Sequence, residues 1–317
     1  MKAVFLDAGT FSAEAHLPAP DGISDYQVYD STPNDAATII ARCQDADIIL
    51  TNKVLLSAEI IHALPKLKLI QLTATGTNNV DKAACDACNV ALYNVAGYSV
   101  DSVPEHTLMM MLSVMRAGSY YHSKATDGTW RSDGKFCLLD MPLFDLANRT
   151  LGIIGAGAIG RRVGELATAF GMHVLYAERQ DKTVCRAGYT AFDEVLANSD
   201  VISLHCPLTN DTAKLINAKT LAKMHKKPLI INVARGGVVD AASIVQAIHQ
   251  GQILGYASDV FDNEPFADDD CLLNIADHPR VLFTPHNAWG SLSAQQRLWQ
   301  ILSTQVSQFI QTYSQNG

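Results

Sequence analysis

The chain has 317 residues, of which 48% are hydrophobic and 18% charged, and its formal net charge is −8. This length and composition predict a globular protein of two domains. The negative charge, without any run of Lys and Arg, argues against nucleic acid or an anionic membrane surface as a partner. An apolar strand pattern begins directly after Met1, and no apolar run approaches membrane-spanning length, so we expect neither a signal peptide nor a transmembrane helix.

The seven cysteines are scattered without the spacing of a disulfide framework. Such a distribution is typical of a reducing compartment, and we expect a cytoplasmic protein. Cys85 and Cys88 form a C-x-x-C pair, but no second Cys or His pair lies near them in the sequence. We therefore interpret this pair as structural and predict no metal site.

Residues 1 to about 100 alternate strand and helix patterns, which predicts a parallel sheet with helices on both faces. The expected strands are 2–6, 26–29, 48–51, 69–72 and 91–93, and the expected helices are 33–42, 57–63 and 81–88. The loop 73–79 follows the fourth strand and is small, polar and rich in N–H and hydroxyl donors. It could bind a carboxylate or be a plain turn.

Ser102 and Glu105 have the spacing of a capping box, which predicts a helix from Ser102 to about Arg116. This helix is apolar nearly all round, so we expect it to be buried on more than one side. It could cross between domains or lie in a dimer interface. The following region, 130–145, shows no clear period and is predicted to be an ordered loop.

The stretch 150–178 carries the clearest motif of the chain. An apolar run is followed by Gly155, Gly157 and Gly160 in the spacing G-x-G-x-x-G. The helical apolar stripe that comes next consists of Val163, Leu166, Ala167 and Phe170. Gly171 is expected to end this helix, and a second strand, 173–177, leads to Glu178.

Strand, glycine turn, helix, strand and acid in this order predict a dinucleotide-binding unit. Gly155 permits the tight turn, Gly157 lets a pyrophosphate approach the helix N-terminus, and Gly160 allows close helix–strand packing. Glu178 could accept hydrogen bonds from both ribose hydroxyls of NAD and would repel a 2′-phosphate, so we expect NADH to be preferred to NADPH. A structural βαβ unit without a ligand is the alternative.

Strands and helices continue to alternate to the end of the chain. The expected strands are 200–205, 229–233, 255–260 and 281–284, and the expected helices are 217–224, 240–250 and a long amphipathic one, 291–312. The predicted fold class is therefore α/β, with two doubly wound parallel-sheet domains.

Arg235, Glu264 and His286 each follow one of the last three predicted strands. Ligands of doubly wound sheets bind beyond the carboxyl ends of the strands, so the three side chains could share one cleft. Each also has a plainer interpretation as a polar residue of a solvated loop.

The three residues fit hydride transfer between a nicotinamide and a 2-keto acid. The planar fork of arginine can contact the carboxylate and the carbonyl oxygen together. Histidine can donate a proton near neutral pH, and a carboxylate behind the imidazole fixes its tautomer and favours its protonated form. Arg235, His286 and Glu264 would fill these roles in turn.

Seven short motifs extend over most of the chain. They are ATGTNNVD (74–81), SVPEHTL (102–108), GIIGAGAIG (152–160), HCPLT (205–209), NVARGGVVD (232–240), DVFDNEP (259–265) and TPHNAW (284–289). Together they resemble the D-isomer-specific 2-hydroxyacid dehydrogenase family over essentially the full length. Within that family TNKV (51–54), AER (177–179) and HNAW resemble the glycerate dehydrogenase, or hydroxypyruvate reductase, branch.

The resemblance implies that Arg235, Glu264 and His286 are the catalytic set. It implies a Rossmann NAD domain, 101–286, inserted into a flavodoxin-like substrate domain, 1–100 and 287–317, with the helix from Ser102 helping to form a homodimer. The residues expected at NAD are Thr75, Gly155, Gly157, Ala158, Ile159, Gly160, Glu178, Cys206, Pro207, Val233, Ala234 and Asp259, the last near the nicotinamide amide. The residues expected at the substrate are Asn52, Lys53, Thr75, Gly76, Thr77, Arg235, His286 and Trp289.

We thus expect an NAD-dependent enzyme that interconverts a small D-2-hydroxy acid and its 2-keto acid, with glycerate and hydroxypyruvate, or glyoxylate, as substrates. Two positions depart from the family pattern: Asn287, where Ile or Leu is more common, and Glu178, where Asp is. Arg179 could also meet a 2′-phosphate. A phosphoglycerate dehydrogenase would need more cations in the substrate loop than Lys53. An NAD-sensing corepressor would usually carry long terminal extensions.

Overall fold

The computed structural model describes residues 1–316, which form two compact units. The first unit consists of Met1–Ser99 and the segment from Trp289 onward, and the second consists of Val100–Ala288. Each unit contains one parallel sheet with helices on both faces, so the predicted fold class is confirmed. None of the helices within 1–316 combines the length and apolarity that crossing a bilayer requires.

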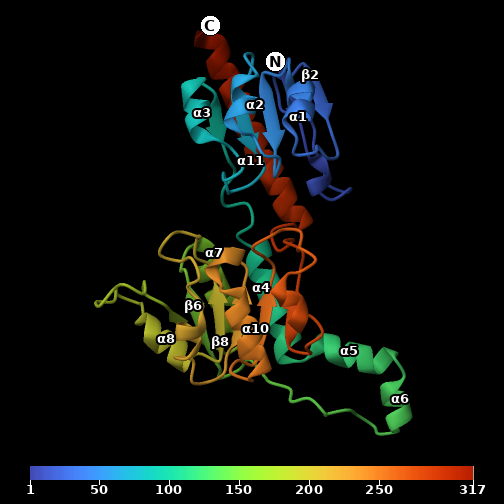
Figure 1. Cartoon of the computed structure of the whole chain (residues 1–317), viewed down its shortest axis with the longest axis vertical. Coiled ribbons are helices and arrows are strands. Elements are labelled where there is room, and N and C mark those ends of the chain that lie inside the picture. The colour runs from blue at the N-terminus through green and yellow to red at the C-terminus, as the bar shows by residue number, and fades with distance from the viewer. Residues whose placement is uncertain (317) are drawn as a thin grey trace. The chain divides into compact units, whose positions relative to one another are not determined.

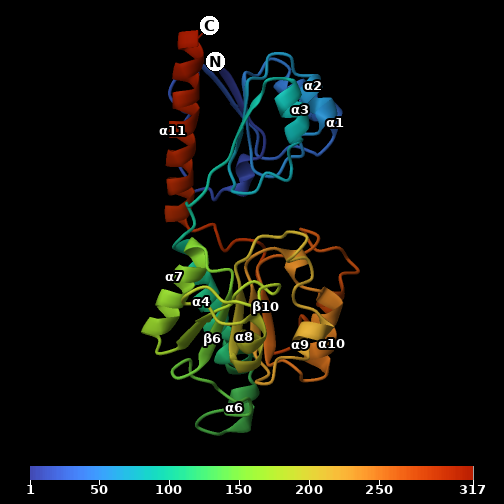
Figure 2. The same ribbon diagram turned by 90° about the vertical axis from the view of Figure 1, so that its left-hand side faces the viewer.

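The sheet of the first unit has the order β2-β1-β3-β4-β5. Its strands are β1 (Lys2–Phe5), β2 (Asp25–Val28), β3 (Ile48–Thr51), β4 (Leu69–Leu72) and β5 (Ala91–Tyr93), and its helices are α1 (Ala36–Cys43), α2 (Ala58–His62), α3 (Lys82–Ala87) and α11 (Leu292–Asn316). Successive strand residues point to opposite faces. Val4 therefore packs in the cluster under α1–α3, and Phe5 packs in the cluster under α11. Figure 2 shows α11 on one face of this sheet and α1–α3 on the other.

The sheet of the second unit has the order β11-β10-β9-β8-β6-β7. Its strands are β6 (Thr150–Ile154), β7 (His173–Tyr176), β8 (Val201–Leu204), β9 (Leu229–Asn232), β10 (Gly255–Ser258) and β11 (Val281–Phe283). The chain runs from β6 to β7 on one side and returns to β8 on the other. This reversal is the switch point beside which doubly wound sheets bind their ligands.

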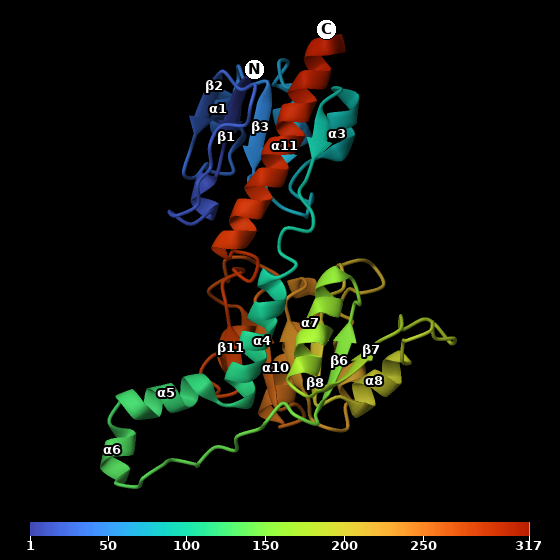
Figure 3. The ribbon, with the colours of Figure 1, turned by 180° about the vertical axis from the view of Figure 1, so that it is seen from behind.

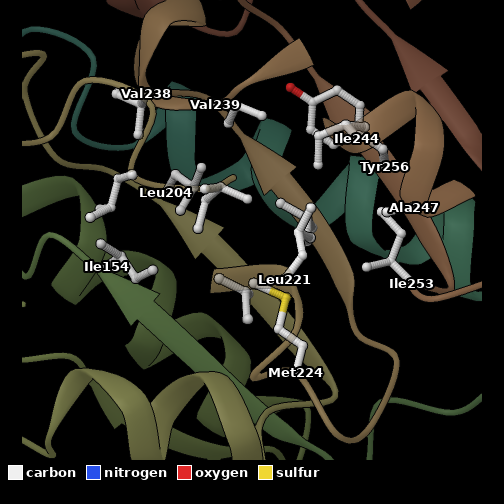
Figure 4. Close-up of a cluster of buried hydrophobic side chains, with 14 of the residues drawn as sticks. Ile154, Leu204, Leu221, Met224, Val238, Val239, Ile244, Ala247, Ile253 and Tyr256 are labelled. Atoms are coloured by element: carbon white, nitrogen blue, oxygen red, sulfur yellow. The ribbon is translucent and has the colours of Figure 1, made fainter. Parts of the chain in front are cut away.

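Two layers of helices cover this sheet (Figure 1). One layer is α4 (Ser102–Met115) with α7 (Ala158–Ala169), and the other is α8 (Phe192–Asn198), α9 (Ala218–Leu221) and α10 (Ala241–His249). Figure 4 shows the core under the second layer, where Leu204 and Tyr256 of the sheet lie among Leu221, Ile244 and Ala247 of the helices. Both faces of the central strands are thus buried, which explains their continuous apolar sequences.

The predicted helix at Ser102 exists, but its predicted capping box is wrong. Ser102 is already the first helical residue, and its hydroxyl donates to the carbonyl of Ala288 at 2.6 Å. The helix is buried along most of its length, as its apolar sequence predicts. The hydroxyl of Ser102 therefore connects the start of α4 to the segment that follows β11.

Three helices were not predicted, and one predicted core residue is exposed. The region after α4 contains α5 (Gly118–Thr126) and α6 (Thr129–Asp133), neither of which has a buried residue, and both project from the unit in Figure 3. The expectation of a loop at 130–145 is therefore partly wrong. The third unpredicted helix is α8. Phe170 is 47% exposed because it caps α7 instead of joining its buried stripe.

Candidate active site

His286 and Glu264 are in direct contact at the carboxyl edge of the second sheet. Nδ1 of His286 lies 2.5 Å from Oε2 of Glu264, and the other carboxylate oxygen of Glu264 accepts the backbone N–H of Phe261 at 2.9 Å. Because the carboxylate is held at both oxygens, it fixes the plane of the imidazole, and Nδ1 is the ring atom that can donate to it. Nε2 is then the ring atom positioned to exchange a proton with a ligand.

The turn that carries His286 is held by a buried carboxylate. His286 has a left-handed backbone, φ +51°, which costs a residue with a side chain about 1–2 kcal/mol. Asp259, 2% exposed, accepts the two following N–H groups, those of Asn287 and Ala288, at 3.0 Å each. The hydroxyl of Thr284 donates to the same carboxylate at 2.6 Å. Asp259 thereby stabilises the conformation that aims His286.

His106 of α4 completes this network. Its Nε2 lies 3.0 Å from Oγ1 of Thr284 and 3.6 Å from Oδ1 of Asp259. Burial lowers the pKa of His106 below its ordinary value, although the carboxylate of Asp259 opposes the shift. Burial therefore favours the neutral form of the ring, and the carboxylate of Asp259 is held by N–H and hydroxyl donors.

Arg235 follows β9 on a turn shaped by two neighbouring residues. The buried side chain of Asn232 accepts the N–H of Ala234 at 3.0 Å and donates to the carbonyl of Arg235 at 2.9 Å. A Cβ on Gly236 would lie 2.1 Å from the carbonyl carbon of Phe261, so only glycine lets this turn meet the loop of Glu264. The exposed guanidinium of Arg235 donates to the carbonyl of Ala234 at 2.6 Å, a bond that it can exchange for a substrate anion.

The glycine turn after β6 has the shape that a pyrophosphate needs. Gly155 has φ +101°, and a Cβ on it would lie 2.5 Å from the backbone nitrogen of Cys206. Gly157 and Ala158 at the start of α7 are exposed, and Gly157 provides no side-chain cap for the first N–H groups of the helix. These uncapped donors fit an anion. Cys206 and Pro207 follow β8, and Val233 and Ala234 follow β9, so all belong to this sheet edge.

Two glycine variants separate packing from cofactor binding. Gly160→Ala is expected to lower the melting temperature, because its Cβ would lie 2.2 Å from the Gly155 carbonyl oxygen, and such overpacking costs about 1–3 kcal/mol. Gly157→Ala should leave the melting temperature unchanged, since no atom of residues 1–316 other than its own chain neighbours lies within 4 Å of the added Cβ, yet it should weaken NADH binding by crowding the pyrophosphate. Thermal denaturation and fluorescence titration measure both. Unchanged NADH affinity in Gly157→Ala would place the pyrophosphate elsewhere.

Glu178 follows β7 as predicted but is engaged by a residue that the sequence analysis did not identify. Its side chain is buried and makes a two-pronged ion pair with Arg186, whose Nη2 and Nε lie 2.7 and 2.8 Å from Oε1 and Oε2. These hydrogen bonds lower the pKa of Glu178 to about 2. Arg179 contributes its backbone N–H to the carboxylate, at 2.9 Å.

The remaining predicted residues belong to the first unit. Asn52 and Lys53 follow β3, and their N–H groups donate to the buried carboxylate of Asp7 at 2.9 and 2.7 Å. Burial raises the pKa of Asp7, against these hydrogen bonds. Thr75, Gly76 and Thr77 follow β4, and the hydroxyl of Thr75 donates to Val95. Trp289 packs edge-on against Phe11 and Tyr98.

No group of three or more His, Cys, Asp or Glu side chains within 1–316 has an arrangement that could hold a metal ion. The polar groups at the edge of the second sheet are instead a cation, a carboxylate–imidazole pair and a helix N-terminus. This donor set suits an anionic organic substrate and a dinucleotide.

Comparisons with known proteins agree with this chemistry. Residues 108–288 match the family model described as D-isomer specific 2-hydroxyacid dehydrogenase, NAD binding domain. A Haemophilus influenzae protein named as a 2-hydroxyacid dehydrogenase is 42% identical over 99% of this chain and 100% of its own length. The glycerate dehydrogenase of Methylorubrum extorquens is 39% identical over 99% of this chain and 98% of its own.

A solved structure extends the agreement to three dimensions. The D-lactate dehydrogenase of Aquifex aeolicus, complexed with NAD and lactic acid, matches with a TM-score of 0.77 and 28% identity, covering 91% of this chain and 89% of its own. The chain therefore belongs to the D-isomer specific 2-hydroxyacid dehydrogenases and is an oxidoreductase that uses NAD.

Proposed function

We propose that the chain reduces hydroxypyruvate to D-glycerate, with glyoxylate as a second substrate. The observation that carries the chemistry is the 2.5 Å contact between His286 and Glu264. It couples a proton donor to the carboxylate that orients it, on the loops after β10 and β11. Arg235 follows the adjacent strand β9 and supplies the cation.

Each residue has one role in this proposal. The guanidinium of Arg235 binds the substrate carboxylate and polarises the keto oxygen. NADH, when bound, supplies the hydride that the carbonyl carbon accepts. Nε2 of His286 donates its proton to the carbonyl oxygen, which becomes the hydroxyl, and the carboxylate of Glu264 stabilises the imidazolium before that transfer. In the reverse direction His286 accepts the proton.

Two observations support hydroxypyruvate. The Methylorubrum extorquens relative, 39% identical, is a glycerate dehydrogenase. Asn52 and Lys53, which we propose as substrate contacts together with Thr75, Gly76, Thr77 and Trp289, have their backbone fixed by Asp7. Polar groups held in place favour a substrate with a C3 hydroxyl, because the analogue without it leaves them unpaired.

Steady-state rates on a panel of 2-keto acids test the substrate. We expect kcat/KM to be highest for hydroxypyruvate, with glyoxylate next, then pyruvate, and 2-ketoisocaproate lowest. Loss of a hydrogen-bonded hydroxyl should cost pyruvate at least about tenfold. If 2-ketoisocaproate were the best substrate, the pocket would be apolar and the glycerate assignment would fail. Preference for 3-phosphohydroxypyruvate would favour a phosphoglycerate dehydrogenase instead.

We also propose a homodimer in the cytoplasm. Met109 of α4 is 41% exposed, and Phe136, in the projecting segment after α6, is 96% exposed. Leu139, in the same segment as Phe136, is 71% exposed, and exposed apolar side chains that gather in one segment are typical of a protein–protein interface. Light scattering should give twice the chain mass of 34.3 kDa, and a monomeric mass would contradict the dimer.

The seven free thiols accord with a reducing compartment, which cell fractionation can test.

A further inference from the structure

The carboxylate of Glu178 has no acceptor capacity left for a ribose. Oε1 accepts the backbone N–H of Arg179 and Nη2 of Arg186, at 2.9 and 2.7 Å. Oε2 accepts the backbone N–H and Nε of Arg186, at 3.0 and 2.8 Å. A carboxylate offers about four lone-pair sites, and all four are used here. Two of the four bonds come from one guanidinium, so Arg186 closes the site that the sequence assigns to the ribose hydroxyls.

Arg186 is held over Glu178 by an aromatic and cationic cluster. Its guanidinium lies 4.0 Å from the ring centre of Tyr189. The hydroxyl of Tyr189 accepts Nη2 of Arg161 at 3.2 Å, and the guanidinium of Arg161 lies 5.4 Å from the ring centre of Tyr176. Because Arg161 is in the first turns of α7, the cluster lies beside the proposed pyrophosphate site. Two guanidinium groups against one carboxylate make it net positive.

Of the two paired side chains, that of Arg186 is the one nearer to solvent. The side chain of Arg186 is 56% exposed, whereas that of Glu178 is 2% exposed beneath it. A ligand that reaches this place from solvent meets a guanidinium before it meets the carboxylate. The ion pair also removes the usual reason for rejecting a 2′-phosphate, which is an uncompensated acid at the end of the second strand.

We propose that Arg186 determines the cofactor selectivity of this chain by closing Glu178 and presenting its guanidinium to the 2′-position of the adenosine ribose, so that NADPH is accepted alongside NADH. The 2′-phosphate pairs with the planar fork of Arg186, with Arg161 adding positive charge. The ribose hydroxyls of NADH, in contrast, reach Glu178 only by displacing one prong of the ion pair. The side chain of Arg186 therefore strengthens the binding of NADPH and weakens the binding of NADH.

Binding measured without any keto acid tests this proposal independently of the substrate. The probes are NADH and NADPH, followed by protein fluorescence, and the fragments 5′-AMP and adenosine 2′,5′-bisphosphate, followed by calorimetry. For the unmodified chain we expect Kd values of NADH and NADPH within about tenfold of each other, a difference of about 1.4 kcal/mol. A preference for NADH of a thousandfold or more would overturn the proposal.

Arg186→Ala should move the two cofactors in opposite directions. It opens Glu178 to the ribose hydroxyls and removes the phosphate partner, so NADH should bind as tightly as before or tighter, and NADPH at least about tenfold more weakly. The two fragments should follow the same pattern. The matched control is Arg179→Ala, because Arg179 reaches Glu178 only through its backbone N–H, which the variant keeps. The control should leave the NADH-to-NADPH ratio unchanged.

Two further outcomes show whether Arg186 determines cofactor selectivity or only supports the loop after β7. Equal weakening of both cofactors in Arg186→Ala would mean that Arg186 only holds the loop after β7, and would overturn the proposal. Glu178→Gln, which removes the buried charge but keeps the side-chain size, should shift the ratio toward NADPH. An unchanged ratio in that variant would contradict the proposal even if Arg186→Ala failed to fold.

Discussion

Arg235→Ala is expected to reduce kcat/KM for 2-keto acid reduction by about 10³-fold or more, while NADH binding stays within about twofold of the original. The loss is large because the guanidinium is the proposed partner of both the substrate carboxylate and the keto oxygen. The effect should be confined to the side chain, since Asn232 holds the turn through the backbone of Ala234 and Arg235, which the variant retains. Steady-state kinetics and NADH titration of the same preparation measure the two quantities.

Arg235→Lys provides the matched control for charge against geometry. Lysine keeps the positive charge but presents a single ammonium in place of a planar fork. We expect this variant to recover part of the loss, mainly through KM, because charge attraction is restored while the two-point contact is not. If Arg235→Ala kept kcat/KM within about fivefold of the original, another group would have to bind the carboxylate, and the role of Arg235 would be rejected.

The strands of both sheets could be predicted because burial on both faces makes them short, uninterrupted apolar runs. Predicted and observed strands at 48–51 and 69–72 coincide with β3 and β4. The helices α5 and α6 could not be predicted in this way, since they have no buried residue and therefore no apolar stripe. In α8 the stripe exists, with Phe192, Val195 and Leu196 buried, but it spans only two turns, which is too short for a helical period to be distinct in the sequence.

In the candidate site, too, some residues could be predicted from a sequence pattern and others could not. The proposed catalytic residues lie on the loops that follow β9, β10 and β11, and their common sheet edge follows from the parallel topology. The groups that hold them do not show in a sequence pattern, because they act on backbone. Asp259 accepts the N–H groups of Asn287 and Ala288, and Asp7 accepts those of Asn52 and Lys53.

Arg186 illustrates a second kind of omission. Arg186 stands eight positions after Glu178 in the sequence, and no strand or helix period links the two positions. The sequence favours Arg179 as the cation near a 2′-phosphate, because Arg179 is adjacent to Glu178. In the structure the side chain that pairs with Glu178 comes from the far end of the loop, where the return of the backbone to Thr190 beside β7 determines the contact.

Removal of the imidazole is the second change with a large expected effect. His286→Ala should lower kcat for reduction by about 10²–10⁴-fold, the usual contribution of a positioned proton donor. NADH affinity should be preserved, because the proposed cofactor contacts lie on other loops. Histidine and alanine both carry a Cβ, so the backbone strain at φ +51° is common to the original protein and the variant. The substitution should therefore not lower the stability through the backbone. A decrease of less than about tenfold in kcat would show that water or another group donates the proton.

Glu264→Gln tests the same pair through the pH dependence of the reaction. In the proposed mechanism His286 donates a proton during reduction, so the rate should fall as pH rises. The carboxylate, 2.5 Å from Nδ1, favours the charged ring, and glutamine keeps the shape of the side chain without that charge. The pH at half-maximal rate should therefore move downward in the variant. The two side chains are 27% and 30% exposed, so solvent weakens their interaction, and the downward direction of the change is the expected result. At low pH the rates of the two proteins should converge, apart from any loss of orientation. A profile that kept its midpoint in Glu264→Gln would separate Glu264 from the proton transfer and leave it only the role of holding the loop through Phe261.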